Sequence, residues 1–182
     1  MSENPYYIIT GAPSTGKTSI LEGLEKRGYA CHKEIARQVI RENLDTGLEV
    51  FPWNQMKLFS DMVLNRMIQL TNSFQPNELC FLDRGMVDLI GYMDFANQPI
   101  PENYILEAKR LGYAKKVFFL PIWADIYTND EERKESLDEA KAIGSALYNA
   151  YERLGFELIE VPKGSVVERI DFIEQQTMVT HQ

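Results

Sequence analysis

Short apolar runs alternate with longer amphipathic segments along most of the chain. The runs have the length of β-strands, and the longer segments repeat their apolar residues at helical spacing. The clearest helical stripe consists of Met56, Phe59, Val63, Met67 and Leu70. The predicted strands are residues 6–10, 29–32, 79–82, 116–120 and 157–161. The predicted helices are residues 17–27, 35–44, 52–72, 86–96 and 102–111, then one that ends at residue 154 and one over residues 165–176.

This order of elements predicts the fold. Strands that alternate with helices form a parallel sheet with helices on both faces. We therefore expect an α/β fold of three layers with a five-stranded parallel sheet. Residues 1–176 form a single domain in this interpretation, and residues 177–182 form a loose tail. Pro52 is expected in the first turn of its helix, and Ser165 is expected to cap the last one.

Composition narrows the classes of function. The chain has 182 residues and a formal net charge of −8, which argues against general nucleic-acid binding, although local basic patches remain open. No apolar run approaches the length of a membrane span, and no signal peptide is evident. Cys31 and Cys80 lack metal or redox spacing and are expected to be free thiols, and His32 and His181 form no ligand cluster. These features are typical of a cytoplasmic protein.

The joint between the first strand and the first helix carries the most specific motif. Residues 11–18 have the pattern G-x-x-x-x-G-K-T, with an apolar strand before it and an amphipathic helix after it. This is the P-loop arrangement, in which backbone N–H groups and a helix N-terminus surround the phosphates of a nucleotide. The residues expected to bind ATP and Mg²⁺ are Gly11, Ala12, Pro13, Ser14, Thr15, Gly16, Lys17, Thr18 and Ser19.

Two of these side chains have distinct expected roles. Lys17 would reach the β- and γ-phosphates and stabilise the transferred charge, and the Thr18 hydroxyl would bind the metal. Pro13 donates no N–H, so its neighbours must supply the donors. A glycine-rich turn before a helix is the simpler alternative, which the complete motif disfavours.

Polar residues follow the third predicted strand. Asp83 at its end is a candidate metal ligand and catalytic carboxylate, and the alternative is a helix cap. Arg84 suits a phosphate or an acidic group of the substrate, but it could equally form a structural ion pair. Asp88 is a candidate substrate-binding residue, although a carboxylate early in a helix is also favoured by the helix dipole.

The second and fourth strands lead to further candidates. Glu34 could be a catalytic base or bind a sugar hydroxyl if the second strand neighbours the third, and Arg37 lies beside it. The alternative is an exposed ion pair. Arg133 is a candidate catalytic arginine on a lid, with Lys134 next to it, or both belong to a solvated charged surface. Residues 162–165 could contact the nucleotide base, but no side chain there distinguishes ATP from GTP.

The motifs in this order resemble a group of P-loop domains known as AAA-type ATPase domains, which are similar to the ribosylnicotinamide kinase domain and to deoxynucleoside kinases. The resemblance spans nearly the whole chain. It rests on GAPSTGKT, on E-x-A-R at residues 34–37, on FLDRG at 81–85, on FFLP at 118–121, on RKES at 133–136 and on YERLGFELIEVP at 151–162. FLDRG differs from the Walker B motif of AAA+ motors, so the resemblance does not imply a hexameric unfolding machine.

The resemblance implies a nucleoside-kinase-like core that uses ATP with magnesium, and it implies that Glu34 and Arg84 lie in the acceptor pocket. We therefore expect a phosphotransferase that moves the γ-phosphate of ATP to a hydroxyl of a small nucleoside- or nucleotide-like molecule. The alternative is a regulatory nucleotide-binding switch that engages a protein or lipid partner. A degenerate scaffold is disfavoured because Lys17, Thr18 and Asp83 are intact.

Overall fold

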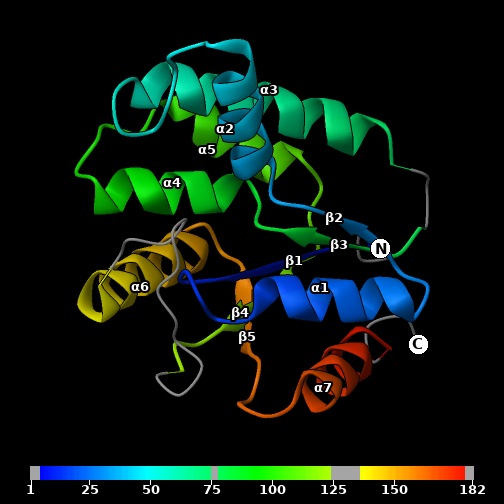
Figure 1. Cartoon of the computed structure of the whole chain (residues 1–182). Helices are drawn as coiled ribbons and strands as arrows, with labels where there is room; N and C mark the ends of the chain where they lie inside the picture. Colours follow the sequence, from blue (N-terminus) through cyan, green and yellow to red (C-terminus); the bar gives the residue numbers. More distant parts are fainter. Residues whose placement is uncertain (1–4, 75–77, 124–135, 179–182) are drawn as a thin grey trace.

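The computed structural model describes residues 5–74, 78–123 and 136–178. Its five strands form one parallel sheet in the order β2-β3-β1-β4-β5 (Figure 1). The strands are β1 (Tyr6–Gly11), β2 (Ala30–His32), β3 (Cys80–Asp83), β4 (Lys116–Leu120) and β5 (Glu157–Glu160). The helices are α1 (Lys17–Lys26), α2 (Ile35–Thr46), α3 (Met56–Asn72), α4 (Met86–Phe95), α5 (Glu102–Arg110), α6 (Leu137–Arg153) and α7 (Val166–Met178).

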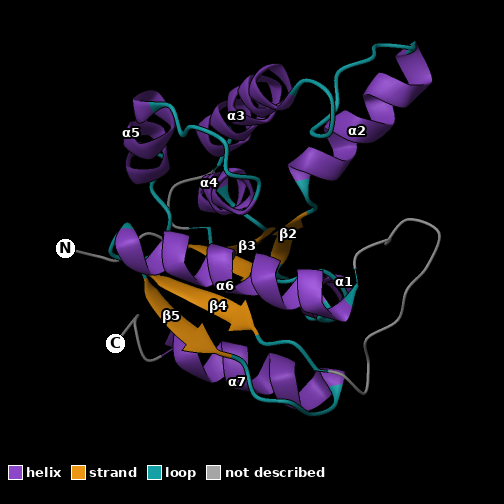
Figure 2. Cartoon of the chain, turned by 90° about the vertical axis from the view of Figure 1, so that its left-hand side faces the viewer, coloured by secondary structure: helices purple, strands orange, loops and turns teal. Residues whose placement is uncertain are grey.

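The sheet lies between two helical layers. Helices α1 and α7 cover one face, α4 and α6 cover the other, and α2, α3 and α5 lie beyond α4 (Figures 1 and 2). The side chains of β1 show why both faces are covered. Ile8 belongs to the apolar core on the α4 side, whereas Tyr7 and Ile9 belong to the core on the α1 side. Successive strand residues point to opposite faces, so a run of apolar residues requires a helical layer on each.

Two glycines allow helices of the same layer to approach closely. A Cβ atom on Gly91 of α4 would lie 2.8 Å from Cδ2 and 3.0 Å from Cα of Leu147 on α6. A Cβ atom on Gly23 of α1 would lie 2.2 Å from Cδ1 of Ile170 on α7. The second glycine lets α7 pack closely against α1.

The predicted fold is confirmed, and all five strand ends agree within one residue. The third helix was predicted wrongly at its start, because α3 begins at Met56 and Pro52 lies in a turn before it. The Asn54 side chain accepts a hydrogen bond from the Phe51 amide, and this local turn replaces the first turn of the expected helix. Helix α7 continues through Met178, two residues beyond the expected end of the domain at residue 176, and residues 179–182 lie outside the described part.

Other expectations concern caps, cysteines and membrane spans. The Ser165 hydroxyl accepts a hydrogen bond from the Glu168 amide at 3.3 Å, which confirms the predicted cap of α7. Cys31 and Cys80 are both free thiols. Among the described helices, none combines the length and the apolar character that crossing a bilayer requires.

Candidate functional site

The loop between β1 and α1 has a backbone that favours glycine at two positions. Gly11 has φ of 143° and Gly16 has φ of 86°, and both values lie where L side chains are disfavoured. A Cβ atom on Gly11 would also lie 2.4 Å from the backbone oxygen of Leu120 on β4. Ser14 adopts φ of 60° between them. The loop therefore has the irregular, tightly turned backbone from which anion-binding nests are built.

The Lys17 ammonium folds back into this loop. Its Nζ atom donates to the carbonyl oxygens of Ala12 at 2.7 Å and Gly11 at 3.1 Å. Burial, helped by the charge of Arg84, lowers the pKa of Lys17 to about 7. An anion in the loop would compensate for this loss of solvation and would hold the ammonium in its charged form.

Oxygen atoms suited to a magnesium ion lie at the same edge of the sheet. Asp83 ends β3, and its Oδ1 atom is buried without a hydrogen-bond partner in the described structure. Burial raises the pKa of Asp83, so the carboxylate lacks the compensation that a cation would supply. Thr18 lies in the first turn of α1 and is exposed. A carboxylate and a hydroxyl are the ligand types that magnesium prefers, so the two residues fit this ion.

Arg84 connects the carboxylates that follow β2 and β3. Its Nε atom lies 3.4 Å from Oε1 of Glu34, and its Nη1 atom donates to Oδ1 of Asp88 at 2.9 Å. The Arg84 residue is 7% exposed, and its guanidinium lies 5.3 Å from the centre of the Tyr92 ring. Burial disfavours the charge, but these neighbours together raise the pKa of Arg84. The guanidinium is therefore held in one place as a permanent cation.

Glu34 lies at the start of α2, as predicted. It is the residue before the first helical one, and its side chain is 19% exposed. Strand β2 pairs with β3, which meets the condition under which Glu34 was expected to face the acceptor pocket. Arg37 lies one turn along the helix, with its Nε atom 3.8 Å from Oε2 of Glu34. The structure thus brings Glu34, Arg37 and Arg84 together.

Asp88 has a more internal position than a substrate-binding residue requires. Its side chain is 3% exposed and accepts hydrogen bonds from Thr10, Arg84, Tyr151 and the Gly85 amide. These donors occupy both carboxylate oxygens. The geometry indicates that Asp88 orients Arg84 and ties α4 to β1 and α6, because no oxygen is left over for a ligand.

Arg133, the candidate lid arginine, and Lys134 lie outside the described residues. The sequence analysis also missed residues that complete the site. Tyr92 and Tyr151 were treated there only as parts of helices. The signal available was Asp88 itself, because a carboxylate within an apolar helix needs polar partners when it is buried. Arg169 was missed as well. It lies on the same side of α7 as Val166, Ile170 and Ile173, and a charged residue within an apolar stripe was the available signal.

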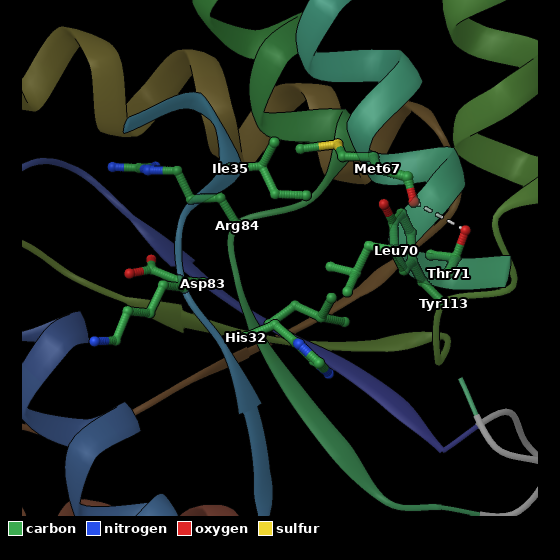
Figure 3. A pocket seen from close by; sticks show the side chains of 10 residues that line it. His32, Ile35, Met67, Leu70, Thr71, Asp83, Arg84 and Tyr113 are labelled. Atoms are coloured by element: carbon green, nitrogen blue, oxygen red, sulfur yellow. Dashed lines mark hydrogen bonds between the residues drawn. The ribbon is translucent and has the colours of Figure 1, made fainter. Parts of the chain in front are cut away.

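A small pocket lies behind these residues, between the ends of β2 and β3 and the last turns of α3. Figure 3 shows Asp83 and Arg84 on one side of it and His32, Leu70 and Tyr113 on the other. His32 packs against the Phe74 ring with a centroid distance of 5.0 Å. The pocket is lined by His32, Lys33, Ile35, Met67, Leu70, Thr71, Leu82, Asp83, Arg84 and Tyr113. Its lining therefore combines the charged groups of this edge with apolar side chains of α3.

Comparison with protein families places this chain. A family model described as an AAA domain matches residues 6–169, which is nearly the whole described chain. The chain belongs to this AAA domain family. The match includes the P-loop and the segments that carry Glu34 and Arg84. A comparison with curated proteins finds no match.

Solved structures show which fold the AAA domain shares. Deoxyadenosine kinase from M. mycoides has a TM-score of 0.67 at 16% identity, over 96% of this chain and 99% of that chain. The YorR protein from Bacillus subtilis, solved in complex with phosphorylated GDP, has a TM-score of 0.61 at 14% identity, over 97% and 98%. Shikimate kinase from Aquifex aeolicus has a TM-score of 0.58 at 14% identity, over 97% of each chain. The AAA domain therefore has the fold of P-loop kinases.

Proposed function

We propose that this AAA domain is a phosphotransferase that moves the γ-phosphate of ATP to a hydroxyl group of a small nucleoside- or nucleotide-like molecule. The observation that carries the proposal is the position of Glu34. Its carboxylate lies at the carboxyl edge of the sheet, 3.4 Å from Nε of Arg84, and Glu34 follows β2, the strand next to the one that ends at Asp83. A nucleotide switch needs the P-loop but has no need of a second carboxylate fixed beside it.

In this proposal the residues divide the work. Backbone N–H groups of residues 11–19 bind the phosphates, and Lys17 stabilises charge on the transferred group. Thr18 and Asp83 hold the magnesium ion, which when bound neutralises phosphate charge and orients the oxygens. Glu34 accepts the proton of the acceptor hydroxyl. Arg84 and Arg37 position the Glu34 carboxylate, and Arg133 is assigned the stabilisation of charge on the phosphates.

Kinases and nucleotide switches differ in whether an acceptor molecule accelerates the release of ADP. ADP release from ATP and magnesium would be measured with a panel of nucleosides, nucleotides and shikimate-like polyols, and GTP would be tested in parallel as the donor. A kinase shows release that an acceptor accelerates and that Lys17→Ala abolishes. Tight nucleotide binding with slow release that no acceptor changes would instead favour the regulatory switch.

A control variant separates the loss of chemistry from the loss of nucleotide binding. Glu34→Gln keeps the P-loop, so it should bind nucleotide as the wild type does and should lose acceptor-dependent release. Equal acceptor-dependent release by Glu34→Gln and the wild type would contradict the role assigned to this carboxylate.

A further inference from the structure

Helix α7 contributes one side chain to the nucleotide-binding loop. The Nη2 atom of Arg169 donates a hydrogen bond to the backbone oxygen of Thr15 at 3.1 Å. Arg169 is 4% exposed, and α7 lies alongside α1 on one face of the sheet (Figure 1). A residue near the end of the chain therefore contacts the middle of the P-loop directly.

The guanidinium of Arg169 lacks the partner that buried cations normally have. Its Nε atom is buried without a hydrogen-bond partner, and within the described residues no carboxylate forms an ion pair with it. Burial lowers the pKa of Arg169, with no acidic neighbour to oppose that effect. Arg27 on α1 is the contrast, because it pairs with Asp171 at 2.7 Å and with Glu174. A buried cation without an anion is costly, which points to an anion that binds nearby.

The contact also sets the direction of a backbone N–H group. In a trans peptide the carbonyl of one residue and the N–H of the next point in opposite directions. With the Thr15 oxygen held by Arg169, the Gly16 N–H points away from α7. The Thr15 hydroxyl, which donates to the Ala12 oxygen at 3.0 Å, fixes the same residue from a second side. This peptide unit is thus held in one orientation before any ligand arrives.

We propose that Arg169 is a positioning residue of the P-loop, which aims the Gly16 N–H at a bound polyphosphate and supplies a buried positive charge that the polyphosphate neutralises. The inference rests on the nucleotide binding of the proposed function. It assigns to α7 a role in phosphate affinity that is independent of the acceptor.

The test uses magnesium tripolyphosphate, which probes the phosphate loop without a base or a sugar. Calorimetry would compare the full-length wild type with Arg169→Met, Arg169→Lys and Arg27→Met, with ATP and adenosine as further ligands. Arg169→Met is expected to lose at least about tenfold in affinity for tripolyphosphate and ATP, since it removes a hydrogen bond from a charged donor. Arg169→Lys keeps the charge and should recover part of that loss.

Arg27→Met is the matched control, because it removes ion pairs that hold α7 without touching the loop. It should bind tripolyphosphate within about twofold of the wild type. A purely structural arginine would lower thermal stability without this phosphate-specific loss. By contrast, Arg169→Met should keep or raise the melting temperature of the free protein, because it removes an uncompensated buried charge.

Three results would overturn the inference: wild-type affinity in Arg169→Met, an equal loss in Arg27→Met, or an equal loss for adenosine. If Arg169→Met does not fold, Arg169→Gln is used instead, because glutamine can still donate to the Thr15 oxygen but carries no charge. If Arg169→Gln binds tripolyphosphate within twofold of the wild type, the inference is overturned. A wild type that binds no tripolyphosphate would overturn the proposed function as well. Wild-type binding that Arg169 does not affect would overturn only the inference.

Discussion

The Nε atom of Arg84 lies 3.4 Å from Oε1 of Glu34, and this contact joins residues that lie just after the ends of two neighbouring strands. Arg84 adopts φ of 66°, a left-handed conformation that is uncommon for residues other than glycine. Strained backbone of this kind persists where surrounding contacts hold it, and Asp88 and Glu34 supply them here. The pair is therefore a preorganised feature of the site.

Glu34→Gln is expected to lower acceptor-dependent turnover by on the order of 100-fold, since an amide cannot accept the hydroxyl proton. The dissociation constant for the nucleotide should stay within about twofold. Steady-state kinetics and calorimetry would measure the two quantities. Glu42→Gln is the control, because the Glu42 carboxylate lies on α2 and pairs with the exposed Arg66. It should leave turnover unaltered. A similar loss in both variants would contradict the role of Glu34.

Lys17→Met is expected to abolish turnover without lowering the melting temperature of the free protein. Lys17 is buried in the loop, and burial lowers its pKa to about 7, so its charged form is disfavoured before the ligand binds. Scanning calorimetry of the free protein would check stability, and ADP release would check turnover. A large drop in melting temperature would show that Lys17 holds the loop together through Ala12 and Gly11 instead.

Gly11→Ala is expected to cost on the order of 3 kcal/mol of unfolding free energy, because the added Cβ would lie 2.4 Å from a backbone oxygen of β4. Gly28→Ala is the matched control. It also has a positive φ, of 94°, but no atom lies within 4 Å of the added Cβ. Its expected cost is about 1–2 kcal/mol. Urea unfolding would measure both, and equal costs would contradict the importance of the β4 contact.

Asp88→Asn is expected to destabilise the protein by about 3 kcal/mol, because the buried Arg84 cation loses one of its two carboxylate partners. Asp94→Asn changes another carboxylate of α4, whose partner Arg153 is exposed, and should cost less than about 1 kcal/mol. Denaturant titrations would measure both values. A small effect of Asp88→Asn would show that the hydrogen bonds from Thr10, Tyr151 and the Gly85 amide hold this side chain without its charge.

Stability should fall as pH drops below about 6.5, through His32. Burial lowers the pKa of His32 below its usual 6.5, despite an opposing contribution from Glu78. The unfolded chain then takes up a proton that the folded chain resists, so this contribution is fully present above pH 6.5 and is lost toward the lowered pKa. His32→Phe should flatten the dependence between pH 7 and 5 in urea titrations. An unchanged slope would exclude His32 as its source.

The strands of the sheet were predicted well because each strand is marked by residues that are adjacent in the sequence. The buried strands are short apolar runs, and residues 11–18 carry a motif whose backbone needs are met at Gly11 and Gly16. Pro52 was predicted in a helix because proline suits the first turn of a helix, but it suits a turn outside a helix equally well. The hydrogen bond that the Asn54 side chain accepts from the Phe51 amide favours the turn. That choice depends on one side-chain hydrogen bond, which periodicity does not report.

The site was predictable only as far as each residue follows a strand. Glu34, Asp83 and Arg84 were found this way because parallel strands deliver their ends to one edge. The partners of Asp88 come from β1 and α6, and the partner of Thr15 comes from α7. Contacts between elements so distant along the chain depend on helix packing, and a single sequence carries no spacing rule for them.

The contact between Thr15 and Arg169 spans 154 positions along the chain. During synthesis the loop at residues 11–18 leaves the ribosome well before Arg169, the residue whose side chain supports it. The backbone of the loop between β1 and α1 can therefore gain the hydrogen bond from Arg169 only after α7 has been synthesised. Phosphate affinity would then report whether α7 has been made and packed, since a fragment that lacks α7 carries the whole motif without the contact from Arg169.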